Sequence, residues 1–536
     1  MSASAWNAAW RTQALPGLAA TGWDLLVIGG GICGAGILRE AARRGWRCLL
    51  LEQHDFAWGT SSRSSKMVHG GLRYIAQGQF GVTRASVHER QRLLREAPGL
   101  VEPLSFMLPH YRGGFPGRRL FGGLLTVYDA LAGRRQHGYC PASTLRYLLP
   151  GLRAEGLLGA THFLDAVTDD ARLVLRVLGA ARADGGEALN GMRATELLRT
   201  GGRVTGVLAE DTETGQQHRF RSRAVAQATG VWAEQLPHQV RDEHIRPLRG
   251  SHLLLPAWRL PVAHAVSFRH PADGRLVFVF PWEGATVVGT TDLDHHEPLA
   301  QEAHISNAEV DYLLAAIAQV FPGAQVHASD VLSTWAGVRP VVSVRGSHKR
   351  PSAESREHAL WVEPGCVTLA GGKLTTFRPL ALEVLRACAA FAGRPMDRRQ
   401  APVFTAEPLP PSSSWLSKPA LRRLHGRHGR TLAGVLQVLE NIGGDCVGAT
   451  RTLWAEVAWA AENELVLHLD DLLLRRTRLG LLLARGGQAE LPRIRALCQP
   501  RLGWSDARWQ QEEADYLALW QRCYSLPASG QQETLP

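Results

Sequence analysis

The sequence predicts an α/β fold with a Rossmann-like nucleotide-binding domain, a β-rich second domain and a C-terminal helical domain. Residues 24–52 run from an apolar strand through a glycine-rich turn and a helix to a second apolar strand, as in the first unit of a nucleotide-binding sheet. Residues 246–294 form short strand-like runs separated by turns. Residues 421–479 read almost entirely as helix and follow a proline-rich linker at 402–411. A chain of 536 residues is long enough for two or three domains.

The glycine-rich turn indicates a dinucleotide site. Gly29, Gly31 and Gly34 have the G-x-G-x-x-G spacing. The first glycine permits a sharp turn, the second lets the backbone approach a pyrophosphate, and the third lets the helix pack close to the strand. The start of that helix offers free N–H groups to an anion. Glu52 ends the second strand, where its carboxylate can accept hydrogen bonds from ribose hydroxyls.

Composition restricts the class of protein further. A hydrophobic content of 45% with 20% charged residues is typical of a globular protein, and no apolar run reaches the roughly 18 residues of a membrane span. Residues 1–20 lack the pattern of a signal peptide and are predicted to be a short flexible lead-in. Eight scattered cysteines without a CxxC pair favour reduced thiols in a cytoplasmic protein.

The net charge of +11 favours anionic partners, either phosphorylated metabolites or an anionic membrane surface. No nucleic-acid-binding motif is present in the sequence, so nucleic acid is not an expected partner. The acidic and histidine residues at 292–297 match no metal-ligand spacing, and no metal is predicted.

Three other segments have an unusual composition. Residues 59–74 are rich in serine and glycine, which fits a solvated loop or a loop lying against a cofactor. Residues 366–376 read as a strand, a Gly-Gly turn with a lysine, and a helix start. Residues 106–136 interleave arginines with apolar side chains, which fits a membrane-surface patch or a partly buried loop over a substrate cavity.

Nine sequence blocks, taken in order, resemble the FAD-dependent glycerol-3-phosphate dehydrogenases of the aerobic respiratory type, within the flavoproteins typified by D-amino-acid oxidase. The resemblance covers residues 23–480, and its blocks are VIGGGICGAG, TSSRSSKMVHGGLRY, DDARLVL, ATGVW, RGSHLL, VGTTD, GVRP, GGKLTT and LDDLLLRRTRLG. It implies an FAD-binding domain at 20–90, 160–232 and 335–400. It also implies an antiparallel-sheet substrate domain at 91–159 and 233–334, and a helical domain at 405–536.

The resemblance implies that the dinucleotide is FAD, held by Gly29, Gly31, Gly34 and Glu52. The serine-rich loop would line the pyrophosphate and flavin through Thr60, Ser61, Ser62, Ser65, Lys66, His69 and Gly70. The second glycine turn would lie at the pyrimidine edge of the flavin through Gly371, Gly372, Lys373, Leu374 and Thr375. A helix start and a lysine there stabilise the negative charge that develops when the flavin accepts a hydride.

The substrate implied by the resemblance, glycerol 3-phosphate, is a dianion and requires guanidinium groups. The matching positions are Arg73, Arg339 and Arg356, with Tyr74 as a hydroxyl partner. Oxidation of the secondary alcohol also requires a base, for which His252 is the first candidate and His69 the second. Alternatively, Arg339 stabilises the developing alkoxide and the proton passes to water.

The expected reaction is oxidation of sn-glycerol 3-phosphate to dihydroxyacetone phosphate, after which reduced FAD passes its electrons to membrane ubiquinone. A cytoplasmic protein bound peripherally to the inner face of the cell membrane, and a homodimer, are expected from the same resemblance. An oxidase that uses oxygen remains an alternative. So does a flavoenzyme with an amine substrate, against which the arginines count, or a degenerate scaffold, against which the retained Arg73, Arg339, Lys373 and His252 count. Departures from the family pattern at Cys33, Arg63 and Glu357 leave room for a shifted substrate preference.

Overall fold

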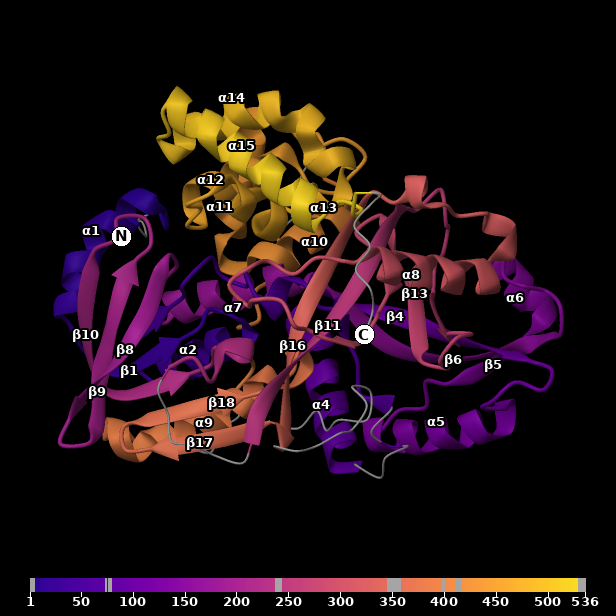
Figure 1. Cartoon of the computed structure of the whole chain (residues 1–536), viewed down its shortest axis with the longest axis horizontal. Helices are drawn as coiled ribbons and strands as arrows, with labels where there is room; N and C mark the ends of the chain where they lie inside the picture. Colours follow the sequence, from indigo (N-terminus) through magenta and orange to yellow (C-terminus); the bar gives the residue numbers. More distant parts are fainter. Residues whose placement is uncertain are drawn as a thin grey trace.

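Two large sheets lie side by side, and the C-terminal helices sit across their junction (Figure 1). The structure is a computed structural model that describes residues 5–72, 75, 80–236, 243–344, 358–397, 401–410 and 416–528. The antiparallel second sheet and the helical C-terminal part agree with the predicted architecture.

The first sheet has eight strands within the described residues. Its parallel centre has the order β18 (Cys366–Ala370), β10 (Gln217–Gln227), β1 (Gly22–Ile28), β2 (Cys48–Leu51) and β7 (Glu187–Leu189). Strand β17 (Ala359–Glu363) pairs antiparallel with β18, and the meander β8 (Met192–Thr200) and β9 (Arg203–Asp211) continues from β10. The apolar runs of β1 and β2 are buried because helices cover this parallel sheet.

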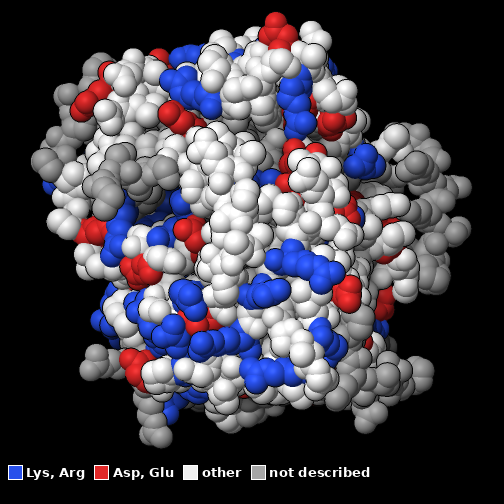
Figure 2. Space-filling model, turned by 90° about the vertical axis from the view of Figure 1, so that its left-hand side faces the viewer, with Lys and Arg blue, Asp and Glu red and all other residues white. Residues whose placement is uncertain are grey.

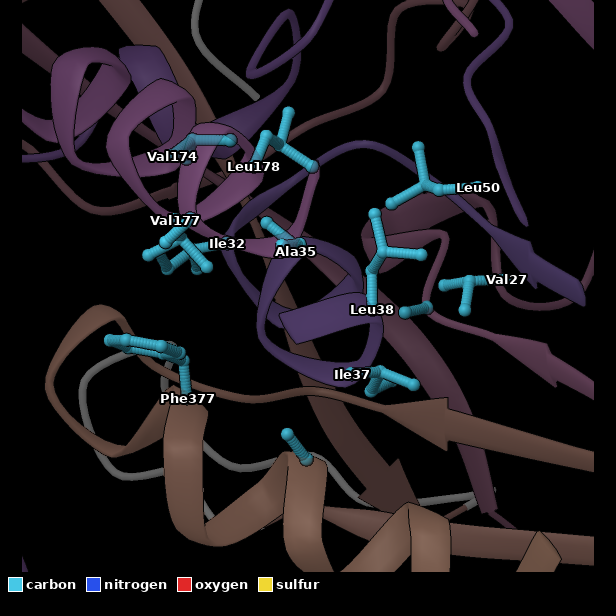
Figure 3. Close-up of a cluster of buried hydrophobic side chains, with 14 of the residues drawn as sticks. Val27, Ile32, Ala35, Ile37, Leu38, Leu50, Val174, Val177, Leu178 and Phe377 are labelled. Atoms are coloured by element: carbon cyan, nitrogen blue, oxygen red, sulfur yellow. The ribbon is translucent and has the colours of Figure 1, made fainter. Parts of the chain in front are cut away.

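Helix α2 (Ile32–Ala42) follows the glycine turn and is buried along almost its whole length. It packs between α7 (Asp170–Ala183) and α9 (Phe377–Ala392), and Figure 3 shows Ile32, Ala35 and Leu38 within this cluster. Each fully buried leucine or isoleucine here stabilises the fold by about 1.5–3 kcal/mol. The first βαβ unit is therefore the centre of the nucleotide-binding core.

The second sheet has ten strands within the described residues and is mostly antiparallel. Its strands are β3 (Met67–Val68), β4 (Val101–Tyr111), β5 (Gly138–Pro141), β6 (Leu157–Thr168), β11 (Glu243–Pro256), β12 (Ala265–Arg269), β13 (Leu276–Trp282), β14 (Ala285–Gly289), β15 (Leu293–Asp294) and β16 (Ser333–Val344). The expected domain boundaries differ from this arrangement. Most of β6 and β16 was assigned to the FAD-binding domain, but both strands belong to the second sheet because they pair with β4 and β11.

The helices around the second sheet are α4 (Phe80–Glu96), α5 (Arg118–Ala132), α6 (Ala142–Leu148) and α8 (Asn307–Val320). The C-terminal part contains α10 (Lys418–His428), α11 (Leu432–Ile442), α12 (Trp454–Asn463), the π-helical η8 (Asp471–Arg476), α13 (Leu479–Leu482), η9 (Ala484–Glu490), α14 (Leu491–Leu502) and α15 (Asp506–Cys523). Nowhere in the described part of the chain is a helix both long and apolar enough to cross a membrane.

The prediction of a flexible lead-in was wrong. Residues Ala8–Ala20 form helix α1, whose N-cap Asn7 accepts a hydrogen bond from Trp10 N at 2.9 Å. Buried Arg11 donates to Asp211 Oδ2 at 3.0 Å and to the carbonyl of Asn190 at 3.0 Å. The helix is therefore fixed to the first sheet by tertiary contacts that the local sequence does not reveal.

Candidate active site

A cavity of about 1660 Å³ opens at the carboxyl ends of the central parallel strands. Gly29 follows β1, Glu52 follows β2, Ala228 follows β10 and Gly371 follows β18, and all four line the cavity. Ligands of open α/β sheets bind at this edge, because the turns that leave the strands meet there. The second sheet supplies the opposite wall.

The first glycine turn adopts the geometry that its spacing predicts. Gly29 has φ +107°, and a Cβ there would lie 2.6 Å from the carbonyl oxygen of Ala228. A Cβ on Gly34 would overlap the carbonyl oxygen of Gly29, so α2 can pack this closely only with glycine. Gly31 lines the cavity, and Ser61 Oγ accepts a hydrogen bond from Ile32 N at 2.9 Å. The start of α2 therefore faces the cavity with the serine-rich loop beside it.

Glu52 lies on the cavity wall with its carboxylate held by backbone amides. Its Oε2 accepts from Gly30 N at 2.5 Å and its Oε1 from His54 N at 2.9 Å. Burial raises the pKa of Glu52 to about 7, although these amides partly oppose the shift. A carboxylate in this environment gains from additional hydrogen-bond donors, as ribose hydroxyls would be.

We expect FAD to bind more tightly as pH rises from about 6 to about 8, by at most about tenfold per unit, because ribose hydroxyls favour the ionised Glu52. The pKa is raised from the ordinary 4.5, so the protonated carboxyl stabilises the FAD-free fold at low pH, and this contribution is lost as pH rises towards 7. Titration of flavin-free protein with FAD at several pH values measures the affinity. The E52Q variant should show no such slope, and a pH-independent wild type would contradict the assignment.

The serine-rich loop is divided between cavity wall and interior. Thr60, Ser61 and Ser65 line the cavity. Ser62 and Lys66 do not, which differs from their expected role as cofactor contacts. Lys66 is fully buried, and its Nζ donates to Ser62 O at 2.9 Å and to Asp170 Oδ1 at 3.1 Å. The described contacts of these two residues therefore lie within the loop and with Asp170 at the start of α7.

The second glycine turn reaches the same cavity. The lining residues here are Gly371, Gly372, Lys373, Leu374 and Thr375, at the start of the short helix η6 (Leu374–Thr376) that leads into α9. A Cβ on Gly372 would lie 3.0 Å from Cys33 Sγ, so the two glycine turns are in contact. Two helix starts and one lysine thus make this end of the cavity favourable for negative charge.

The two candidate bases occupy different positions. His69 is exposed on the cavity wall, and Thr375 Oγ1 donates to its carbonyl oxygen at 3.4 Å. His252 is buried outside the wall, stacked on Trp335 at 4.8 Å, with its Nε2 hydrogen-bonded to Ser65 Oγ at 2.9 Å. Burial, together with the charge of Arg339, lowers the pKa of His252 well below 6.5. We therefore place His69 ahead of His252 as the candidate base.

Gly70, expected as a cofactor contact, also lies off the cavity wall, and its N–H donates to Asp165 Oδ1.

Arg339 on β16 lines the cavity in a fixed orientation. Its Nη1 lies 3.1 Å from Asp292 Oδ1, and its Nη2 donates to Thr290 Oγ1 at 3.0 Å. Gly250 on the neighbouring β11 leaves room for the guanidinium, which a Cβ there would overlap. Arg275, also on the cavity wall, donates to the carbonyl oxygen of Asp292 at 2.7 Å. Asp292 therefore holds both guanidinium groups, that of Arg339 through its carboxylate and that of Arg275 through its backbone carbonyl.

Sequence reasoning missed Arg275 and the apolar part of the wall. Arg269 and Arg275 flank the β12–β13 turn and both line the cavity, and this symmetric pair of arginines around a turn was the available signal. The apolar part of the wall comes from the second sheet and α5, through Phe106, Leu108, Phe121, Leu124, Phe163 and Phe278. The predicted substrate residues Arg73, Tyr74 and Arg356 lie outside the described residues.

The site fits FAD by its own chemistry. The glycine turn at Gly31 is open to a ligand, Glu52 can accept from a ribose, and a second helix start with Lys373 lies in the same cavity. All three backbone segments expected around one cofactor line one cavity. The fold and this site define an FAD-dependent oxidoreductase.

Comparisons with known proteins specify the family. Residues 24–378 match the family of FAD dependent oxidoreductases, and residues 397–509 match the C-terminal domain of alpha-glycerophosphate oxidase. The chain is 34% identical over 545 residues to glycerol-3-phosphate dehydrogenase 2 of Mycobacterium bovis, with 96% of this chain and 91% of that protein covered. It is 37% identical over 382 residues to the aerobic glycerol-3-phosphate dehydrogenase of Bacillus subtilis, with 70% and 68% covered.

A solved structure agrees with these relatives. The glycerol-3-phosphate dehydrogenase from Bacillus halodurans complexed with FAD has a TM-score of 0.74 at 25% identity, with 98% of this chain and 100% of that chain covered. This chain belongs to the family of FAD-dependent glycerol-3-phosphate dehydrogenases. The predicted family, fold class and cofactor are confirmed.

Proposed function

We propose that the protein oxidises sn-glycerol 3-phosphate to dihydroxyacetone phosphate and passes the electrons to membrane ubiquinone. The observation that carries this proposal is the pair Arg339 and Arg275, joined through Asp292 on the wall of the cavity that fits FAD. A phosphate dianion needs such guanidinium donors, whereas an amine or amino-acid substrate needs fewer cations. The names of the relatives support the same substrate.

The proposed roles follow from position. Bound FAD supplies the acceptor for the hydride that leaves the carbon bearing the secondary hydroxyl. His69 takes the hydroxyl proton, because it is exposed in the cavity and its backbone is held by Thr375. Lys373 and the helix start beside it stabilise the negative charge that accompanies reduction. His252 orients Ser65 from behind.

The decisive experiment is anaerobic addition of glycerol 3-phosphate to the purified flavoprotein. The visible absorption band of the flavin should bleach, whereas glycerol without the phosphate should cause little change because it offers the arginines no anionic group. A flavin band that persists with excess glycerol 3-phosphate would remove the proposed reaction.

The electron acceptor is a separate part of the proposal. The apolar wall formed by Phe106, Phe163 and Phe278 supports a lipid-soluble ring as acceptor, because such a ring needs an apolar approach to the flavin. The match of residues 397–509 to a domain of alpha-glycerophosphate oxidase favours oxygen as the second candidate. Reduction of a short-chain ubiquinone without peroxide would support the first acceptor, and stoichiometric peroxide under air would support the second.

We place the membrane contact at α5 and the turn before it, on the cytoplasmic side of the cell membrane. One face of α5 is buried through Phe121, Leu125 and Tyr128, while Leu120 and Phe115 are 60% and 69% exposed. The two interpretations of residues 106–136 thus apply to the same segment, because Leu120 and Phe115 are exposed and also line the cavity. The segment lines the cavity through β4, the turn at residues 112–117 and α5, and the exposed Arg118 and Arg119 lie next to Leu120 on the helix.

Replacing Leu120 with Glu should reduce retention on anionic membranes by roughly tenfold, since it removes apolar insertion and adds repulsion. Sedimentation with liposomes of bacterial lipid measures the bound fraction. A second basic surface provides the control. Figure 2 shows Lys and Arg gathered over the lower half of the side that lies at the left of Figure 1. Strand β10 lies on this side of the molecule and carries the exposed Arg219 and Arg221. R221E should leave retention nearly unchanged, and the opposite ranking would move the contact to that side.

A further inference from the structure

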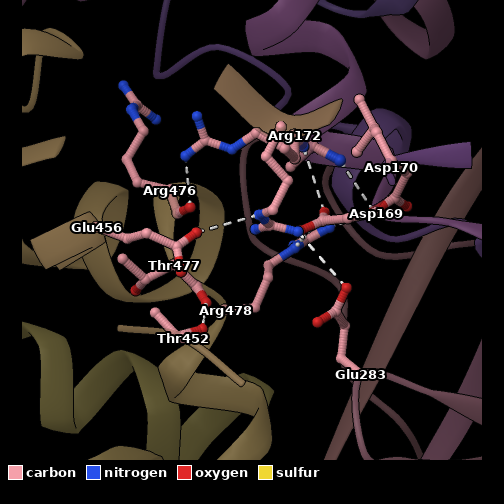
Figure 4. A network of polar contacts seen from close by, with 12 residues as sticks. Asp169, Asp170, Arg172, Glu283, Thr452, Glu456, Arg476, Thr477 and Arg478 are labelled. Carbon is pink, nitrogen blue, oxygen red and sulfur yellow. Dashed lines mark hydrogen bonds and ion pairs between the residues drawn. The ribbon is translucent and has the colours of Figure 1, made fainter. Parts of the chain in front are cut away.

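The C-terminal helical domain contributes no described residue to the cavity wall, yet it reaches the cofactor loop. Its segment from Asp471 to Arg478 carries three arginines, Arg475, Arg476 and Arg478, each no more than 2% exposed. Figure 4 shows Arg478 extending towards Asp169 and Asp170 at the start of α7. Burial of so many charges is costly unless they are paired, so this arrangement fixes geometry rather than simply adding stability.

Arg478 connects the C-terminal domain to the serine-rich loop directly. Its Nη2 donates to the carbonyl oxygen of Ser62 at 3.1 Å and pairs with Asp170, and its Nε donates to Asp169 Oδ1 at 3.0 Å. Although burial alone would raise it, Arg478 and Arg427 hold the pKa of Asp169 well below its ordinary value. The Arg478 guanidinium therefore links the backbone carbonyl of Ser62 to the side chains of Asp169 and Asp170.

Asp170 ties further atoms of the loop to the same point. Its Oδ2 accepts from Ser64 N at 3.0 Å and from Ser64 Oγ at 2.7 Å, and its Oδ1 lies 3.1 Å from Lys66 Nζ. Ser61, which precedes this clamped stretch, and Ser65 within it line the cavity, as do Arg63 and Ser64. The loop is therefore held at three alternate residues, Ser62, Ser64 and Lys66, while Ser61 and Ser65 face the cavity.

A second contact comes from the end of α15. Tyr524 bonds Glu302 through its hydroxyl, and Arg63 Nε lies 3.3 Å from the same hydroxyl oxygen. Arg63 also pairs with Glu302 at 2.5 Å and lies over the ring of Trp58 at 4.8 Å. The C-terminal domain therefore contacts two neighbouring residues of the loop, Ser62 through Arg478 and Arg63 through Tyr524.

We infer that the C-terminal helical domain is a clamp for the FAD-binding loop, with Arg478 and Tyr524 as positioning residues. By holding Ser62–Lys66 in the shape that presents Ser61 and Ser65 to the cavity, the clamp preorganises the loop before FAD binds. Preorganisation raises affinity because the loop need not be ordered during binding. This gives the arginine-rich segment a role in cofactor retention.

The first test compares R478K with R423K. Both replace a mostly buried C-terminal arginine by lysine, but Arg423 pairs with Glu456 and Glu283, away from the loop. Loss of a charge-assisted hydrogen bond to the loop should weaken FAD binding by roughly tenfold in R478K only. Flavin-free protein is titrated with FAD, and the thermal unfolding midpoint without FAD is recorded in parallel. Equal affinities in the two variants would overturn the inference.

A milder pair guards against misfolding. Y524F removes the hydroxyl that meets Arg63 and Glu302, whereas Y516F removes a hydroxyl on the same helix that bonds Gly486 O at 2.6 Å. Trypsin provides the readout in flavin-free protein, because Arg63 and Lys66 are 6% and 0% exposed. Y524F should be cut after Arg63 or Lys66 faster than Y516F and should release FAD faster on dialysis. Identical cutting and FAD release in both variants would contradict the clamp.

Discussion

Replacing Arg339 with Met should lower kcat/KM for glycerol 3-phosphate by about three orders of magnitude. The guanidinium is aimed into the cavity by Asp292 and Thr290, so an anionic substrate finds it already oriented. Loss of one partner of a desolvated charge pair costs on the order of 4 kcal/mol, which is about a thousandfold in rate. R339K, which keeps the charge but loses the planar fork, should lie between wild type and R339M. Steady-state kinetics with a soluble dye acceptor measure the effect.

The matched control is R246M. Arg246 lies on β11 in the same sheet and pairs with Asp294 at 2.6 Å, but it does not line the cavity. Its loss should change kcat/KM less than about threefold, and both variants should retain the flavin spectrum. If R339M kept kcat/KM within about tenfold of wild type, Arg339 would have no direct contact with the substrate phosphate in the transition state.

Local sequence was sufficient to predict the cofactor turns. The strand, glycine turn and helix of β1–α2 are adjacent in the chain, and each glycine has a local steric reason, so spacing alone defines the structure. The second turn at Gly371–Gly372 follows the same logic. The convergence of the two turns came from the family resemblance, because no local pattern records that Gly372 packs against Cys33.

The sequence does not indicate which residues of the serine-rich loop face the cavity and which face the protein interior. Ser, Arg and Lys are all polar, and nothing in their order shows which of them faces a cavity. The outcome depends on Asp170 and Arg478, which are far away in the sequence and attract Lys66 and the Ser62 carbonyl inwards. For the same reason the resemblance implies Lys66 as a cofactor contact but does not indicate its buried ion pair with Asp170.

The position of His252 shows a similar limit. A histidine in a β-strand faces one of two sides, and its side is set by the register of β11 with β14 and β16, which places it against Gly289 and Trp335. Helix α1 was missed because Pro16 and Gly17 within it favour a loop, whereas the ion pair of Arg11 with Asp211 supplies the tertiary contact that fixes it. Both positions are set by long-range contacts that local sequence does not record.

The largest expected effect on the cofactor site itself comes from Gly34→Ala. The added Cβ would overlap the carbonyl oxygen of Gly29, so α2 would have to move away from β1. The helix is buried between α7 and α9 and has no free space for this movement, as a Cβ on Gly36 would already press on Phe377. We expect a loss of about 4 kcal/mol or more in the free energy of unfolding, with no FAD retained.

Gly179→Ala is the matched control for that substitution, because Gly179 lies inside the neighbouring helix α7 with no atom within 4 Å of its added Cβ. The same chemical change should stabilise the protein by up to about 1 kcal/mol, since alanine favours a helix more than glycine does. Urea unfolding and the flavin content of the purified variants measure both effects. A Gly34→Ala protein that kept FAD at wild-type stability would mean that α2 can separate from β1 without cost, which would contradict the close packing that makes this turn a cofactor site.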